Sequence, residues 1–272
     1  MKLHRDKHRT EGEPLCPFAT ARRWVLPAGF DLTSSDLERA QDFYGTVFGW
    51  TFESQGPAVG HYITASKDGR QIAGMLANVR QWPFPDGWST YFHVADVGAT
   101  LSALPGAGAT IRLGRMQLPA KGVMAAVTDP SGAAFRLWQP LEAAGFEMVG
   151  EAGAPVWHQL TTRDYRAAIN FYREVFGWHT EQVADSDEFR YFTAWFDDQP
   201  LLGIKDGEKS LADGSTAQWS TFFGAEDLDK TLQDITDAGG TVLQPIEETP
   251  YGRLATASDP TGVTFNLSSP HS

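Results

Sequence analysis

The chain of 272 residues repeats itself, and this repeat restricts its possible folds more than any other feature of the sequence. Residues 32–50 read LTSSDLERAQDFYGTVFGW and residues 160–178 read LTTRDYRAAINFYREVFGW, at an offset of 128 positions. An Asp-Pro-x-Gly motif at residues 129–132 recurs at residues 259–262, at an offset of 130 positions. Because the offset changes so little, the sequence is interpreted as a tandem duplication whose halves differ by short loop insertions.

Each half also contains a shorter pattern of one helix and four strands, which occurs twice. In the first half, we expect strands at 27–33, 50–52, 61–65 and 71–77 with a helix near 37–48, then strands at 89–94, 110–113, 123–128 and 134–138 with a helix at 97–104. Ser35 and Glu38 have the spacing of a capping box. The sequence thus predicts an α+β fold of four βαβββ units.

Aromatic residues recur at helical spacing in both copies of the long motif. They share one apolar face of the predicted helix or follow it directly, and they are Phe43, Tyr44, Phe48 and Trp50 in the first half and Phe171, Tyr172, Phe176 and Trp178 in the second. We expect these side chains in the hydrophobic core rather than in a functional site.

Charge and cysteine content limit the partners of the chain. The 22 basic and 34 acidic residues give a net charge of −12, which opposes binding to nucleic acid or an anionic membrane surface and is compatible with a neutral or cationic ligand. A single cysteine, Cys16, excludes an intramolecular disulfide and indicates a reducing compartment. Residues 1–23 are polar and lack the apolar core of a signal peptide, so we expect a flexible N-terminal arm and a cytoplasmic protein.

The helix motif D-L-x-x-A-x-x-F-Y-x-x-x-F-G-W, with the closing Asp-Pro-x-Gly, resembles the vicinal oxygen chelate superfamily of glyoxalases, bleomycin-resistance proteins and extradiol dioxygenases. The resemblance covers residues 25–269, and the duplicated chain is similar to two-domain actinobacterial glyoxalase-like proteins. It implies that each pair of units curls one mixed β-sheet into a ligand cup. We expect domains at 24–141 and 155–270, joined by a linker at 142–154. A chain with four units can complete both cups alone, so we expect a monomer or a homodimer.

The resemblance further implies a divalent metal held by His and Glu from four strand positions of one cup. These positions fall at Gly29, near Gly74-Met75, near Ser89 and at Arg136 in the first half, and at Trp157, near Gly203-Ile204, near Ser220 and at Asn266 in the second. None supplies an imidazole or carboxylate ligand. We therefore predict no metal at this site and no other cofactor. A displaced divalent-metal site using residues such as Asp31, His61, His93 or His158 is the alternative.

Residues two apart on a strand share a face, so the neighbours of these positions should also line the cups. The candidate acid, base and anion-binding residues of the first cup are Asp31, His93 and Arg136, and the remaining candidate ligand-binding residues are Tyr91, Trp138, Trp157, Gln159, Phe222 and Asn266. Two structural roles compete with this interpretation. Arg136 could pair with a structural carboxylate, and His93 could cap a strand end. His158 should face away from its cup, as a structural histidine.

Aromatic loop segments could border the cup mouths or pack between the two halves; they are 61–62, 82–85, Trp88 and 250–253. Together these features predict a metal-independent glyoxalase-like protein that binds a hydrophobic, aromatic or polyketide-like small molecule in natural-product biosynthesis or self-resistance. Acid–base catalysis on that molecule is left open. The alternatives are a lyase, isomerase or dioxygenase with a displaced metal site, and a non-catalytic recognition protein.

Overall fold

The computed structural model describes residues 27–79, 84–119, 121–141, 147–196, 199–215 and 217–269. The predicted arm at 1–23, residues 82–83 of one aromatic loop and residues 142–146 of the predicted linker lie outside the described residues.

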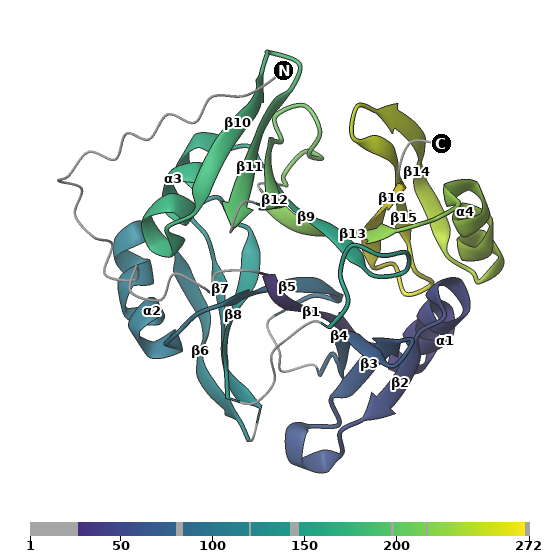
Figure 1. Ribbon diagram of the computed structural model, residues 1–272. Helices are drawn as coiled ribbons and strands as arrows, with labels where there is room; N and C mark the ends of the chain where they lie inside the picture. Colours follow the sequence, from purple (N-terminus) through teal and green to yellow (C-terminus); the bar gives the residue numbers. More distant parts are fainter. Residues whose placement is uncertain are drawn as a thin grey trace.

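Each half contains two units of one helix and four strands, as the sequence predicts (Figure 1). The first half consists of β1 (Pro27–Ser34), α1 (Leu37–Phe48), β2 (Thr51–Ser54), η1 (Pro57–Val59), β3 (Ile63–Lys67), β4 (Arg70–Ala77), β5 (Gly87–His93), α2 (Val97–Ala103), η2 (Leu104–Ala107), β6 (Thr110–Leu118), β7 (Gly122–Thr128) and β8 (Ala134–Pro140). The second half consists of β9 (Pro155–Thr162), α3 (Tyr165–Phe176), β10 (His179–Asp185), β11 (Arg190–Phe196), β12 (Gln199–Asp206), β13 (Ala217–Gly224), α4 (Leu228–Asp237), β14 (Thr241–Thr249), β15 (Gly252–Ser258) and β16 (Thr264–Ser269).

The eight strands of each half form one mixed sheet. The strand order is β2-β3-β4-β1-β5-β8-β7-β6 in the first half and β10-β11-β12-β9-β13-β16-β15-β14 in the second. The two units of the first half join where β1 pairs antiparallel with β5, while β1 runs parallel to β4 and β5 runs parallel to β8. The predicted α+β class with two mixed sheets is confirmed.

Repeated aspartate residues begin the helices. The side chain of Asp36 accepts a hydrogen bond from the backbone N–H of Arg39, so Asp36 is the N-cap of α1. The capping box predicted for Ser35 and Glu38 is therefore wrong, and the Ser35 hydroxyl instead donates to Asp86 at 2.7 Å. Gly49 ends α1 in the left-handed conformation, at φ 71°, which explains a glycine in the repeated motif. No helix within the described ranges is both long and apolar enough to cross a bilayer.

The hydrophobic cores are shared between the halves. One core is formed mainly by the second unit of the first half and the first unit of the second half, and the other mainly by the two remaining units. In Figure 1, α1 accordingly lies beside α4 on one side of the molecule, and α2 lies near α3 on the other. The short helix η2, which follows α2, contacts α3. All eight motif aromatics predicted to be core are buried.

The repeated motifs bond to each other across this boundary. The Tyr44 hydroxyl of α1 donates to Asp259 of the second half at 3.2 Å and accepts from the Trp88 indole at 3.0 Å. The symmetry-related Tyr172 donates to Asp129 of the first half at 2.9 Å. The Trp88 ring also lies 5.5 Å from the Phe223 ring of the second half, so Trp88 packs between the halves, which was the second of its two predicted roles. The Asp-Pro-x-Gly motif of each half is therefore a partner of the helix motif of the other half.

Candidate functional site

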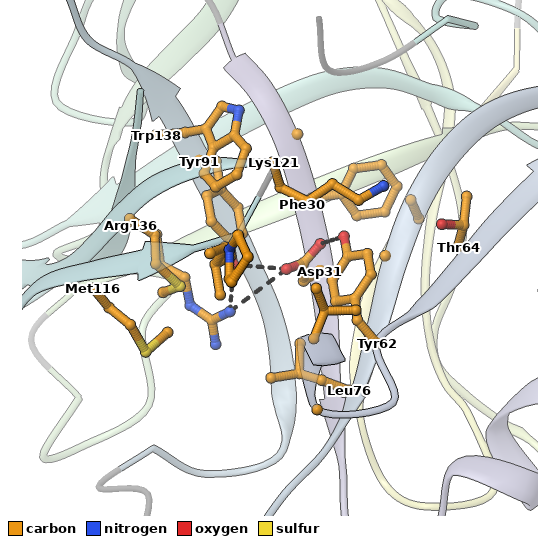
Figure 2. Close-up of a pocket in the computed structure, with 18 of the residues that line it drawn as sticks. Phe30, Asp31, Tyr62, Thr64, Leu76, Tyr91, Met116, Lys121, Arg136 and Trp138 are labelled. Carbon is orange, nitrogen blue, oxygen red and sulfur yellow. Dashed lines mark hydrogen bonds and ion pairs between the residues drawn. The ribbon is translucent and has the colours of Figure 1, made fainter. Parts of the chain in front are cut away.

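The first sheet encloses a cavity of about 460 Å³ (Figure 2). This volume is in the range of small-molecule sites, which extends from about 300 to 1,000 Å³. Its apolar wall comes from several strands and includes Leu76, Met116, Leu118, Met124 and Trp138. Asp31 and Arg136 also line the cavity, and they are the only two charged residues among the lining groups that are nearly fully buried.

Asp31 is the centre of a hydrogen-bond network (Figure 2). Its Oδ1 accepts from the Tyr62 hydroxyl at 2.8 Å, and its Oδ2 accepts from the Tyr91 hydroxyl at 2.6 Å. Arg136 Nη1 lies 3.7 Å from Asp31 Oδ2 and donates to the Tyr91 oxygen at 2.7 Å, while Nη2 donates to Thr33 Oγ1 at 3.0 Å. We call these five residues the Asp31 network.

Strand register explains how these residues meet. Tyr91 of β5 lies opposite Gly29 of β1 on one side and beside Arg136 of β8 on the other. Asp31 lies opposite Ser89 and is in register with Gly74 of β4. The family resemblance placed a metal-ligand position near Ser89. The strand register instead puts Tyr91, two residues further on, in line with the other expected positions, Gly29 and Arg136.

Burial and the neighbouring groups have opposite effects on the pKa of Asp31. Burial is the largest effect and raises the pKa of the Asp31 carboxyl above its ordinary value, although the Arg136 guanidinium and the two tyrosine hydroxyls lower it in part. Both oxygens of Asp31 accept hydrogen bonds, which is the pattern of an ionised carboxylate. Burial, with the neighbouring Asp31 charge, raises the pKa of Tyr62 and that of Tyr91, so both phenols keep their protons as donors.

A tyrosine hydroxyl occupies the space that a metal ligand on β4 would need. A Cβ atom built on Gly74 would overlap the Tyr62 hydroxyl and Asp31 Oδ1. The second half repeats this arrangement, because a Cβ on Gly203 would overlap the Tyr191 hydroxyl. In both sheets the glycine at this position makes room for a phenol. The sequence had named Tyr62 as a residue of the cup mouth, and its contact with Asp31 was not foreseen.

The side chains present do not fit the divalent metal that the fold family implies. The four expected positions supply no imidazole or carboxylate, and the described residues contain no group of three His, Cys, Asp or Glu side chains that could hold a metal ion. Among the displaced candidates, His61 is exposed and His158 belongs to the other sheet. The Asp31 carboxylate is already bonded at both oxygens.

The second cup replaces the charges of the first with neutral side chains. Gln159 and Asn266 stand where the first half has Asp31 and Arg136, at offsets of 128 and 130. The indole of Trp157, at the position of Gly29, donates to the Tyr191 hydroxyl at 2.9 Å, and that hydroxyl lies 3.2 Å from Gln159 Oε1.

The other predicted second-cup residues have structural contacts. Asn266 Oδ1 accepts from Thr256 at 2.9 Å, and Phe222 is buried beside it on β13. A bulky indole and two amides, each hydrogen-bonded to hydroxyl groups, therefore stand where the first cup has a glycine and an ion pair.

Two histidines lie apart from the Asp31 network. His93 ends β5 beside Trp138 and is not among the residues that line the cavity. His158 is buried on β9, where its Nδ1 lies 3.2 Å from Thr221 Oγ1 and its ring meets the edge of Phe30 from the first half. Burial lowers the pKa of His158 to about 4, so it is neutral at pH 7. This agrees with the structural role expected for His158.

Comparisons with known proteins agree with the duplicated fold. Anthracycline biosynthesis protein DauV of Streptomyces sp. (strain C5) is 31% identical over 259 residues, which cover 89% of this chain and 92% of that protein. CFP32 of Mycobacterium bovis, provisionally named a glyoxylase, is 30% identical over 262 residues, covering 93% of this chain and 98% of that protein.

The crystal structure of the 2,3-dioxygenase LapB from Pseudomonas sp. KL28 has the same fold, with a TM-score of 0.63 at 15% identity. The similarity covers 93% of this chain and 94% of that one. The sequence profile of one superfamily matches residues 28–137 and again residues 154–267. Because that profile matches both halves, the chain belongs to the Glyoxalase/Bleomycin resistance protein/Dioxygenase superfamily.

Proposed function

We propose that the chain binds a hydrophobic, aromatic small molecule of the polyketide class in the cavity of the first sheet, without a metal ion. The observation that carries this proposal is the placement of a buried Asp31–Arg136 ion pair in an otherwise largely apolar cavity, where the family implies a metal. The biosynthetic name of the Streptomyces relative supports an aromatic polyketide as the ligand class.

The wall and the Asp31 network have different roles in this proposal. Flat aromatic rings fit against Trp138 and the flexible side chains of Met116 and Met124, because thioethers adapt to irregular apolar surfaces. A carbonyl or hydroxyl oxygen of the ligand would approach the Asp31 network, where charged and phenolic groups can orient it.

Acid–base catalysis, if the bound molecule is transformed, would use the Asp31–Tyr91 pair. The two oxygens lie 2.6 Å apart, with the phenol proton between them, and the adjacent Arg136 stabilises negative charge on either oxygen. A ligand oxygen that displaced one of these hydrogen bonds could therefore exchange a proton with the network. His93 has no assigned part in this step.

Blocking the cavity tests the proposal. Gly29→Trp copies Trp157 of the second cup, and a Cβ at Gly29 meets nothing within 4 Å, so the backbone accepts the change. Gly114→Trp is the matched control, because it adds the same indole in open space on β6, outside the cavity.

Binding is followed by calorimetric titration with emodin, a trihydroxyanthraquinone, as the probe. Wild type and Gly114→Trp should bind the probe with equal affinity, and Gly29→Trp should lose binding. Equal binding by all three proteins would place the ligand elsewhere and refute the proposal.

A further inference from the structure

The charged residues of the cavity lining are Asp31, Lys121 and Arg136. With Asp31 ionised, it cancels one of the two cations and leaves one positive charge; with Asp31 protonated, two remain. The cavity is therefore positive in either protonation state, although the chain as a whole has a net charge of −12. Long-range attraction does not bring an anion to such a protein, so any preference for one must arise from contacts inside the cavity.

Lys121 is the source of this positive charge. It directly precedes β7, in the β6–β7 hairpin that also contributes Met116 and Leu118 to the wall. The side chain is half-buried, and within the described ranges its ammonium belongs to no ion pair. Figure 2 shows the ammonium directed along the cavity toward the side on which Thr64 lies. Arg136, in contrast, is committed to Asp31, Tyr91 and Thr33.

The internal repeat offers an independent comparison. Lys121 and Tyr251 each directly precede the glycine that begins β7 or β15, at an offset of 130. Tyr251 is 62% exposed and uncharged. The three charged residues of the first cup thus correspond to Gln159, Asn266 and Tyr251 in the second. All three charged residues of the first cup are thus replaced by uncharged residues in the second, which is expected if the three act together on one ligand.

We infer that the ligand of the first cup is an anion, an aromatic compound with an acidic oxygen such as a carboxylate or an ionised phenol, and that Lys121 binds this oxygen. The inference rests on the proposed function and adds the charge of its ligand. The apolar rings would lie against Trp138 and the methionines, and the acidic oxygen would lie next to the ammonium at the hairpin. Lys121 is thereby a specificity-determining residue for charge.

Two probes of nearly equal shape test the inference. One is anthraquinone-2-carboxylate, which is anionic at pH 7, and the other is the neutral anthraquinone-2-carboxamide. Calorimetric titration of wild type should show the carboxylate binding about tenfold more tightly, the size expected for one charge-assisted hydrogen bond. Lys121→Met should remove this preference and leave carboxamide affinity unchanged. Lys230→Met, which makes the same charge change on α4, should keep the preference.

The outcomes separate the inference from the proposed function. If both probes bind wild type equally, and Lys121→Met changes neither affinity, the cavity binds aromatic ligands without selecting an anion and the inference is overturned. If neither probe binds wild type, or if Gly29→Trp leaves both affinities intact, the proposed function itself is wrong. A carboxylate preference that survives Lys121→Met but disappears in Lys230→Met would assign the effect to the surface charge and also overturn the inference.

Discussion

Replacing Gly74 by alanine should show whether the Tyr62 phenol occupies the space of the absent metal ligand. The new Cβ would overlap both the Tyr62 hydroxyl and Asp31 Oδ1, so the phenol must move away. Overpacking costs about 1–3 kcal/mol. The lost hydrogen bond from Tyr62 to a charged acceptor adds about 1.5–3 kcal/mol. We therefore expect Gly74→Ala to lower the free energy of unfolding by about 4 kcal/mol.

A double-mutant cycle with Tyr62→Ala isolates this contact. Each single variant loses the hydrogen bond from Tyr62 to Asp31, but the double variant can lose it only once. Without the phenol, the new Cβ also overlaps one fewer side chain. The double variant should therefore be more stable than the sum of the two single effects predicts. The expected coupling is about 2 kcal/mol, read from urea unfolding midpoints at constant m-value. Gly114→Ala, in open space on β6, is the control and should change stability by less than about 1 kcal/mol. Additive single effects, within about 0.5 kcal/mol, would refute the reasoning.

Two further predictions concern the boundary between the halves. The pKa of His158 is about 4 in the folded protein against an ordinary 6.5, so between these pH values the unfolded chain binds a proton that the folded chain does not. The stability that His158 contributes above pH 6.5 should therefore fall by about 3 kcal/mol as the pH drops through 4. Urea unfolding should show a flatter pH dependence for His158→Gln than for wild type, and parallel curves would contradict the assignment. Tyr44→Phe and Tyr172→Phe should each lower unfolding stability by about 1–3 kcal/mol, because Asp259 or Asp129 loses a buried donor; calorimetry showing unchanged melting would contradict the cross-half bonds.

The repeat made the fold predictable, because spacing between motifs survives loop insertions and identifies each unit. The aromatic core was predictable for a similar reason, since Phe43 and Tyr44 recur at helical spacing in both halves. Their partners were not predictable. The bond from Tyr44 to Asp259 joins residues 215 positions apart, and periodicity within one helix carries no information about which half covers it.

The candidate site was predictable where strand alternation alone decides the facing of a side chain. The cavity is lined, as expected, by Asp31, Tyr91, Arg136 and Trp138. His93 does not line it, because strand alternation predicts which face a side chain is on but not how far along the strand the cavity extends. Tyr62 directly precedes β3, and its bond to Asp31 depends on the pairing of β3, β4 and β1 across the sheet.

The account's central claim is that the first cup binds its ligand through the Asp31 network and without a metal ion. Titration of the protein with emodin before and after exhaustive dialysis against EDTA, followed by addition of Mn²⁺, Zn²⁺, Fe²⁺ or Ni²⁺, tests this claim most directly. We predict the same dissociation constant for emodin before and after the EDTA dialysis. Loss of emodin binding after EDTA, with recovery at one equivalent of a divalent ion, would contradict the account.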